Sequence, residues 1–302
     1  MSILVVGSVA LDTIETPFAK REDALGGSAM YFSIGASFFS DVRLVGVVGT
    51  DFPEDAIALL RKHNVDITGL QQVEGKTFRW SGRYHMDMNR RDTLDTQLNV
   101  LEEFSPVIPD TYQSTDFLFL ANIHPTLQLD VLSQVPEPEY VITDTMNLWI
   151  DTTLDDLWKV IKQTDIMLMS DSEIRQLTGE TNLLIAGKQL LEKGPGYVII
   201  KKGEHGAMLV DAEGVFFAPG FPVEDIVDPT GAGDVFAAGL VGYLDKVGAV
   251  TDKTLRQAVI YGSTLASFNV EDFSLDRLKT LTMGEIKERY RMFKQITQFE
   301  SE

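Results

Sequence analysis

One stretch, residues 227–240, constrains the chain most, because a turn rich in small residues leads directly into an apolar, alanine-rich run. Pro229 fixes its own φ, and Gly231 and Gly233 lack a Cβ, so the backbone can turn sharply there. A helix that begins near Ala232 would add unpaired N–H donors and a partial positive charge at the turn. The stretch therefore predicts a loop that enters a buried helix and suits a bound phosphate.

Asp234 follows these glycines directly. A carboxylate in the first turn of a helix can be purely structural, because it faces the positive end of the helix dipole. Beside a phosphate the same charge would repel the ligand unless it takes part in the chemistry. The role that fits is a general base, which accepts the proton of a hydroxyl that attacks phosphorus.

Residues 228–234 resemble the second signature of the ribokinase-like (PfkB) carbohydrate kinases, which is an acidic residue, one or two small or turn residues, and then Thr-Gly-Ala-Gly-Asp. Pro229 stands where that pattern most often has Thr. The resemblance implies transfer of the ATP γ-phosphoryl group to a primary alcohol, with Mg²⁺ on the triphosphate and Asp234 as the base. The backbone amides implied to hold the phosphoryl charge are those of Gly231, Ala232 and Gly233.

The chain length is that of one large α/β domain, although 302 residues would equally permit two. The 44% apolar content is ample for a core. We find no Pro-, Ser- or Gly-rich linker and no internal repeat. The sequence therefore predicts a single domain over residues 1–302.

The formal net charge of −19 implies a surface that is acidic on average and repels polyanionic partners. We expect no binding to nucleic acid and none to an anionic membrane. The absence of Cys excludes disulfides and thiolate metal sites. The first residues lack a basic segment, and their apolar run is too short for a signal or a membrane span, so a cytoplasmic location is expected.

Short apolar runs alternate with helical patterns along most of the chain. Runs of this kind are typical of strands buried on both faces of a parallel sheet. The alternation predicts a doubly wound, mostly parallel sheet flanked by helices. The runs are residues 3–6, 42–48, 117–121, 140–143, 166–169 and 197–200.

Polar and apolar residues alternate over residues 77–84 and 93–100, with a polar turn between them. This pattern predicts a hairpin with one face packed against the protein and the other exposed to solvent. In the family resemblance it belongs to a β lid, formed by about residues 13–24 and 73–100, that covers the acceptor. In several members the lid also forms a dimer clasp, so a homodimer is an expectation here.

Four residues are expected at the acceptor. Asp12 and Asn122 follow predicted strands, where an open α/β sheet binds its ligands. Asp144 ends a third strand on the same rim. Asp12 can equally order its own turn. Gly26 and Gly27 permit close approach of a ligand, or form a plain turn, and the resemblance places them over the acceptor.

The nucleotide side is implied by two segments that are similar to family motifs. Ser170 and Glu173 match an Asn-x-x-Glu segment that orders Mg²⁺ and its waters, with Ser in place of the usual Asn. The same two residues also spell a helix capping box. Gly203 and Gly206 form a Gly-x-x-Gly turn against the nucleotide, with Lys202 able to reach phosphate or to lie exposed in the turn.

Two further residues complete the implied nucleotide side. Thr230 lies within the signature, and Asn269 ends a helical pattern near where the family closes over the base. Relatives are frequently activated by a monovalent cation such as K⁺, for which Asp228 is the candidate.

The acceptor is the least determined part of the prediction. A sugar is the first hypothesis, and a nucleoside is the alternative, because Phe78, Trp80 and Tyr84 can stack on a base or pack within the hairpin. A different class of function is a regulator that binds a nucleotide or sugar without catalysis. Retention of Asp234 argues against that class, since a pure binder gains nothing from the charge, while Ser170 argues weakly for it.

Overall fold

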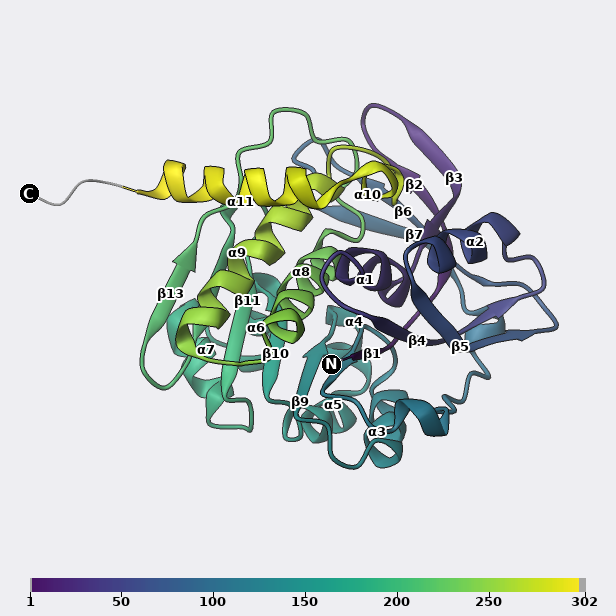
Figure 1. Cartoon of the computed structure of the whole chain (residues 1–302), viewed down its shortest axis with the longest axis horizontal. Helices are drawn as coiled ribbons and strands as arrows, with labels where there is room; N and C mark the ends of the chain where they lie inside the picture. Colours follow the sequence, from purple (N-terminus) through teal and green to yellow (C-terminus); the bar gives the residue numbers. More distant parts are fainter. Residues whose placement is uncertain (1, 299–302) are drawn as a thin grey trace, which may run out of the picture.

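The computed structural model describes residues 2–298, which form two sheets and the helices around them (Figure 1). The larger sheet has nine strands in the order β13-β12-β11-β10-β9-β8-β1-β4-β5. All its neighbouring strands are parallel except β11–β12 and β12–β13. Its strands are β1 (Ile3–Val6), β4 (Val42–Gly49), β5 (Val65–Val73), β8 (Phe117–Leu120), β9 (Tyr140–Asp144), β10 (Ile166–Ser170), β11 (Tyr197–Lys201), β12 (Ala207–Val210) and β13 (Val215–Ala218).

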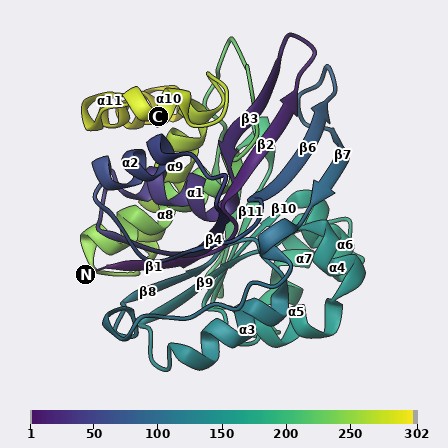
Figure 2. The same cartoon turned by 90° about the vertical axis from the view of Figure 1, so that its right-hand side faces the viewer.

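Helices cover both faces of this sheet (Figure 2). One face carries α1 (Ser28–Ala36), α2 (Glu54–Lys62), α8 (Ala232–Val247), α9 (Asp252–Asn269), α10 (Asp276–Thr280) and α11 (Met283–Thr297). The other carries α3 (Pro125–Gln134), α4 (Asn147–Thr152), α5 (Leu154–Ile161), α6 (Asp171–Thr178) and α7 (Leu183–Leu191). Strand β1 shows why two layers are needed, because Ile3 and Val5 join one buried cluster while Leu4 and Val6 join another. The predicted doubly wound α/β fold is confirmed.

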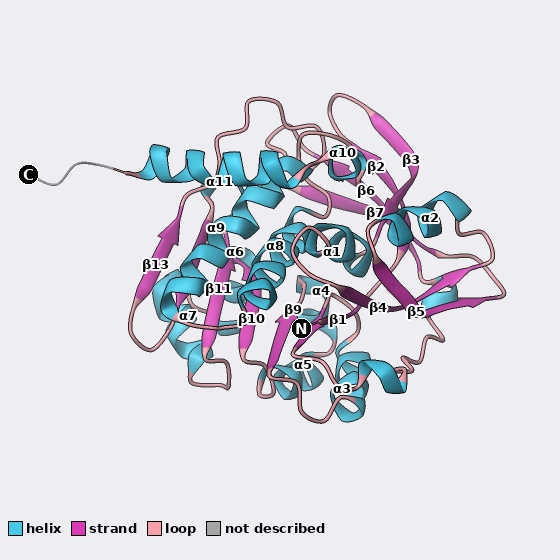
Figure 3. Ribbon diagram, in the orientation of Figure 1, coloured by secondary structure: helices cyan, strands magenta, loops and turns pink. Residues whose placement is uncertain are grey.

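A second sheet of four strands, in the order β3-β2-β6-β7, projects from the edge of this layered body (Figures 2 and 3). Its strands are β2 (Ala10–Glu15), β3 (Lys20–Gly26), β6 (Phe78–Tyr84) and β7 (Arg91–Gln97). Side chains of its packed face form a small apolar cluster with Phe273, which comes from the loop after α9. The sheet is therefore anchored to the C-terminal part of the chain.

Several predicted bounds differ from the structure. The segment at 93–100 is displaced, because β7 ends at Gln97 and a 3₁₀-helix occupies Asn99–Leu101. Asp12, expected in a turn after β1, lies inside β2, since the chain enters the second sheet directly. The expected lid segments 13–24 and 73–100 include parts of the second sheet, and its action as a lid stays a prediction. Residues 1 and 299–302 of the predicted domain lie outside the described part of the chain.

No helix within residues 2–298 is both long enough and apolar enough to cross a bilayer.

Candidate active site

The loop that enters α8 is held in place from three sides. The Asp228 carboxylate is fully buried and accepts hydrogen bonds from the backbone N–H of Thr230 (2.9 Å) and of Ser274 (3.0 Å). The Asn269 side chain donates to the carbonyl of Thr230 at 2.8 Å. The Thr230 hydroxyl donates to the Tyr84 hydroxyl at 3.1 Å, which links the loop to the second sheet. The turn is therefore fixed by hydrogen bonds that involve Asp228, Thr230 and Asn269.

Gly231 is the helix N-cap and has a left-handed φ of 76°. A Cβ at this position would lie 2.5 Å from the Tyr31 ring, so only glycine fits. The backbone N–H groups of Gly231 and Gly233 donate to no other residue within the described part of the chain. Free donors at the N-terminus of a sixteen-residue helix suit a phosphate. The N–H of Ala232, the third predicted donor, instead donates to the Pro229 carbonyl at 3.2 Å. The structure thus leaves two of the three amides predicted for the anion hole without a partner in the described chain.

Asp234 lies in the first turn of α8 and is partly buried. Burial raises the pKa of its carboxyl to about 7, and the nearby charge of Asp144 adds to this rise. The positive charges of Lys201 and Arg91 act in the opposite direction. A carboxyl with a pKa near neutrality is well matched to take up a proton during catalysis.

An ion pair that the sequence did not indicate lies beside this helix. The Lys201 Nζ donates to Asp144 Oδ2 at 2.5 Å, and the two side chains are 16% and 4% exposed. The same Nζ lies 3.2 Å from where a Cβ on Gly233 would be. The Lys201 ammonium therefore lies beside Gly233.

Ser170 and Glu173 form a reciprocal cap at the start of α6. Glu173 Oε2 accepts from the Ser170 N–H at 2.6 Å, and Ser170 Oγ accepts from the Glu173 N–H at 3.2 Å. Burial raises the pKa of Glu173, while the charge of Lys201 acts to lower it. The capping role is thus present. Carboxylate oxygens are also the kind of ligand that Mg²⁺ prefers.

The Gly-x-x-Gly turn after β11 is a 3₁₀-helix at Gly203–His205. Its two glycines have φ of 55° and 87°, and the Lys202 N–H donates to the Gly206 carbonyl at 2.8 Å. A Cβ on Gly203 would lie 2.8 Å from Oδ1 of Asn89, which belongs to the turn between β6 and β7. The turn therefore lies against the second sheet, on the same side of the molecule as the site.

Asp12, which was predicted at the acceptor, is 4% exposed. Burial raises the pKa of Asp12 to about 8, with a further contribution from the charge of Asp228. Its Oδ1 is buried with no hydrogen-bond partner among residues 2–298. A Cβ on Gly26 would lie 1.9 Å from Asp12 Oδ2, and Gly27, with φ of 91°, packs on the Ser8 backbone. The unpaired oxygen fits a ligand hydroxyl.

Asn122 lies at the predicted edge of the sheet, but its amide is already used. Its Oδ1 accepts from Trp149 Nε1 at 2.7 Å, and its Nδ2 lies 3.2 Å from the Met146 sulfur. These contacts fix the orientation of the Asn122 amide, and its role at the acceptor stays a prediction.

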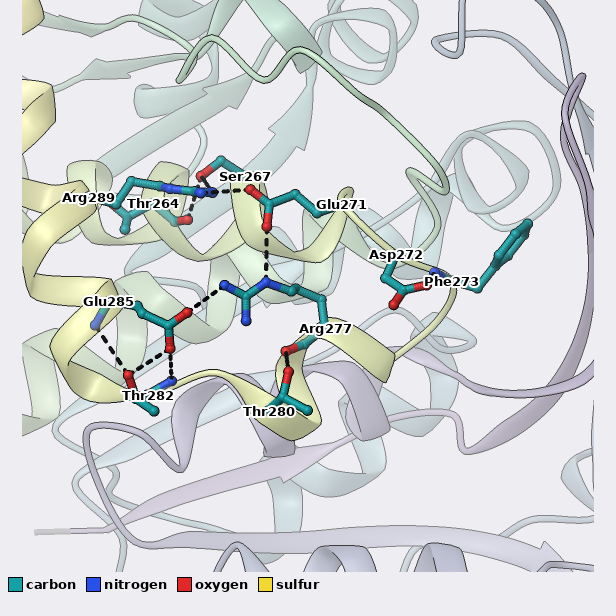
Figure 4. Close-up of polar contacts among 10 residues, drawn as sticks. All are labelled: Thr264, Ser267, Glu271, Asp272, Phe273, Arg277, Thr280, Thr282, Glu285 and Arg289. Atoms are coloured by element: carbon teal, nitrogen blue, oxygen red, sulfur yellow. Dashed lines mark hydrogen bonds and ion pairs between the residues drawn. The ribbon is translucent and has the colours of Figure 1, made fainter.

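A polar network fixes the segment that supplies Ser274 (Figure 4). Glu271 lies between two arginines, accepting from Arg277 at 3.0 Å and from Arg289 at 2.6 Å. Arg277 also donates to Glu285 at 2.7 Å, and Arg289 lies 3.4 Å from the centre of the Phe268 ring. This network connects α9, α10 and α11, and so supports the loop that closes on Asp228.

Comparison with known proteins agrees with this geometry. The family model described as pfkB family carbohydrate kinase matches residues 24–279. The cytidine kinase of Thermococcus kodakarensis is 30% identical over 253 residues, covering 80% of this chain and 88% of that protein.

Solved structures share the fold. The Methanocaldococcus jannaschii nucleoside kinase, an archaeal member of the ribokinase family, has a TM-score of 0.77 at 21% identity, covering 96% of this chain and 98% of the other. A putative ribokinase II from E. coli in its apo form has a TM-score of 0.81 at 20% identity, covering 96% and 99%. The chain belongs to the pfkB family of carbohydrate kinases.

Proposed function

We propose that this kinase transfers the γ-phosphoryl group of ATP to the primary hydroxyl of a sugar or of a ribose-containing compound. The observation that carries the proposal is the first turn of α8, where Asp234, with a pKa of about 7, follows the free N–H groups of Gly231 and Gly233. A base next to an anion hole is the arrangement that phosphoryl transfer to an alcohol requires.

In this proposal the acceptor oxygen attacks the γ-phosphorus while Asp234 takes up its proton. The bond between the γ-phosphorus and the bridging oxygen breaks, and its electron pair leaves on the β-phosphate of ADP. The amides of Gly231 and Gly233 hold the charge of the group in transit. A contribution from the Ala232 amide, which donates to the Pro229 carbonyl, stays a prediction. Mg²⁺, held through water by Glu173, would neutralise part of the triphosphate charge. Lys202, Gly203 and Gly206 are proposed to face the nucleotide, with Thr230 and Asn269 shaping the turn.

Asp12 is proposed to bind acceptor hydroxyls, because its Oδ1 is buried without a partner in the described chain. Gly26 permits this position of the carboxylate, since a Cβ there would collide with Oδ2. A sugar remains the first candidate. A nucleoside is the second candidate, and the similarity to a cytidine kinase supports this alternative. An aminoimidazole riboside kinase from Salmonella typhimurium, 33% identical over 127 residues, is a further relative with a riboside substrate.

Three expectations stay predictions. A K⁺ site at Asp228 is one of them, and each oxygen of this carboxylate already accepts one hydrogen bond from a backbone N–H. A homodimer through the second sheet and a cytoplasmic location are likewise proposals.

The test is coupled ADP release with a panel of pentoses, hexoses, cytidine, uridine, adenosine and inosine. We expect one class of acceptor to give saturable turnover that requires Mg²⁺. Ligand-induced thermal stabilisation without turnover on any acceptor would favour the non-catalytic regulator.

A further inference from the structure

The ion pair of Lys201 and Asp144 depends on the order of the strands. The two residues end β11 and β9, which flank β10, and Lys201 lies in register with Ser170 at the end of β10. The Lys201 side chain crosses β10 to reach Asp144. The ammonium is thus placed at the ligand-binding edge of the sheet and points toward its centre.

The surroundings of this ammonium are strongly acidic. Burial alone would lower the pKa of Lys201, but the charges of Asp144, Glu173 and Asp234 outweigh burial and raise it. Lys201 therefore carries its charge throughout the physiological range. Lys201 acts on all three carboxylates, and Arg91 adds its positive charge at Asp234. Each of the three carboxylates would repel a triphosphate.

The distances place the ammonium next to the anion hole. The Lys201 Nζ lies 3.2 Å from a Cβ built on Gly233, and the Gly233 N–H is one of the free donors. A phosphoryl oxygen that accepts from this N–H would lie within reach of the ammonium. Ion pairing with Asp144 fixes the ammonium there before a ligand binds.

We propose that Lys201 is a further catalytic residue whose ammonium contacts the phosphoryl group in transit, and that Asp144 is a positioning residue that aims it. This inference rests on the proposed function. Lys201 keeps its proton and supplies only charge, as an additional donor of the anion hole. Asp144 keeps the lysine stem extended across β10, so that the ammonium remains beside Gly233 when the nucleotide leaves.

The main test variant is Lys201→Met, which keeps the length of the stem and removes the charge. We expect kcat to fall about 100-fold or more, as for loss of one anion-hole donor. The dissociation constant of a non-hydrolysable ATP analogue should rise, measured calorimetrically, while that of AMP stays the same. The exposed Lys193, which precedes β11, supplies the matched control Lys193→Met, which should change neither quantity.

Removing one partner of a buried ion pair can destabilise the fold, because it leaves an unpaired charge. The double variant Lys201→Met with Asp144→Asn removes both charges and avoids this penalty. We expect it to melt close to the wild type and still to lose kcat. Lys201→Arg should recover part of the activity, since it restores the charge with a different shape.

Two outcomes would overturn the inference. The first is a kcat within threefold of wild type in Lys201→Met or in the folded double variant. The second is an equal loss of affinity for AMP and for the ATP analogue in Lys201→Met. The failure of the proposed function is separable. If the wild type transfers phosphate to no acceptor, the contact of Lys201 with the nucleotide phosphates is still decided by the analogue and AMP measurements.

Discussion

Replacing Asp234 by Asn removes the proposed base while keeping the size of the side chain. General base catalysis contributes typically 10²–10⁴-fold, so we expect kcat to fall by about that factor. The affinity for an ATP analogue should stay the same or increase, because a negative charge leaves the first turn of α8, next to the free amides.

The same substitution should stabilise the fold at high pH. Burial raises the pKa of Asp234 from 3.8 to about 7, which at 1.36 kcal/mol per pH unit corresponds to about 4 kcal/mol as an upper limit. A raised pKa in the folded state gives stability that is full below 3.8 and is lost as the pH rises toward 7. The gain of Asp234→Asn over wild type should therefore grow between pH 4 and pH 7 and then remain constant.

The assay pairs single-turnover kinetics with urea unfolding at pH 5 and pH 8. The control for kinetics is calorimetric binding of the ATP analogue, which shows that the site of the variant is intact. Near-normal turnover would remove Asp234 from the role of base. The tested quantity is the free energy of unfolding of Asp234→Asn minus that of the wild type. If this difference is smaller at pH 8 than at pH 5, burial does not penalise the ionised Asp234 carboxyl of the wild type.

Three more perturbations test other parts of the site. First, kcat/KM should rise with pH up to about 7 and then level, because Asp234 must be ionised to accept a proton, and a flat profile between pH 5 and pH 8 would contradict this. Second, Gly231→Ala should weaken the binding of the ATP analogue at least tenfold. The control Gly179→Ala has a similar φ of 71° and nothing within 4 Å of the added Cβ, so it should cost only about 1 kcal/mol of stability and leave binding unchanged. Third, Arg289→Met should lower the free energy of unfolding by about 2–3 kcal/mol, because it breaks two partly buried hydrogen bonds of a charged group. The exposed Arg256→Met should cost about 0.5 kcal/mol or less, and equal losses in urea unfolding would refute the role of the network.

Local chemistry made part of this molecule predictable from its sequence. The turn and helix at 227–240 could be identified because Pro229, Gly231 and Gly233 dictate backbone geometry without help from distant residues. The buried strands could be identified because a strand covered on both faces must be apolar along its length. The capping pair Ser170 and Glu173 lies three residues apart and is likewise a local feature.

Contacts between distant segments were not predictable. Lys201 and Asp144 are 57 residues apart, and only the strand order places their ends on either side of β10. Asn122 was placed at the correct edge of the sheet, but a sequence does not show that Trp149 and Met146 occupy its amide. The partly buried arginine network was not predictable for the same reason, since Arg277 and Arg289 resemble ordinary surface charges in helical patterns.

The most direct measurement is to locate the transferred phosphate in the product. The wild type is incubated with γ-labelled ATP, Mg²⁺ and the best acceptor of the panel, and the product is analysed by coupled proton and phosphorus NMR. We predict one ADP per phosphate ester, with the ester on the hydroxymethyl carbon. Release of inorganic phosphate without an ester, or an ester on a ring hydroxyl, would contradict the account of Asp234 as the base for a primary alcohol.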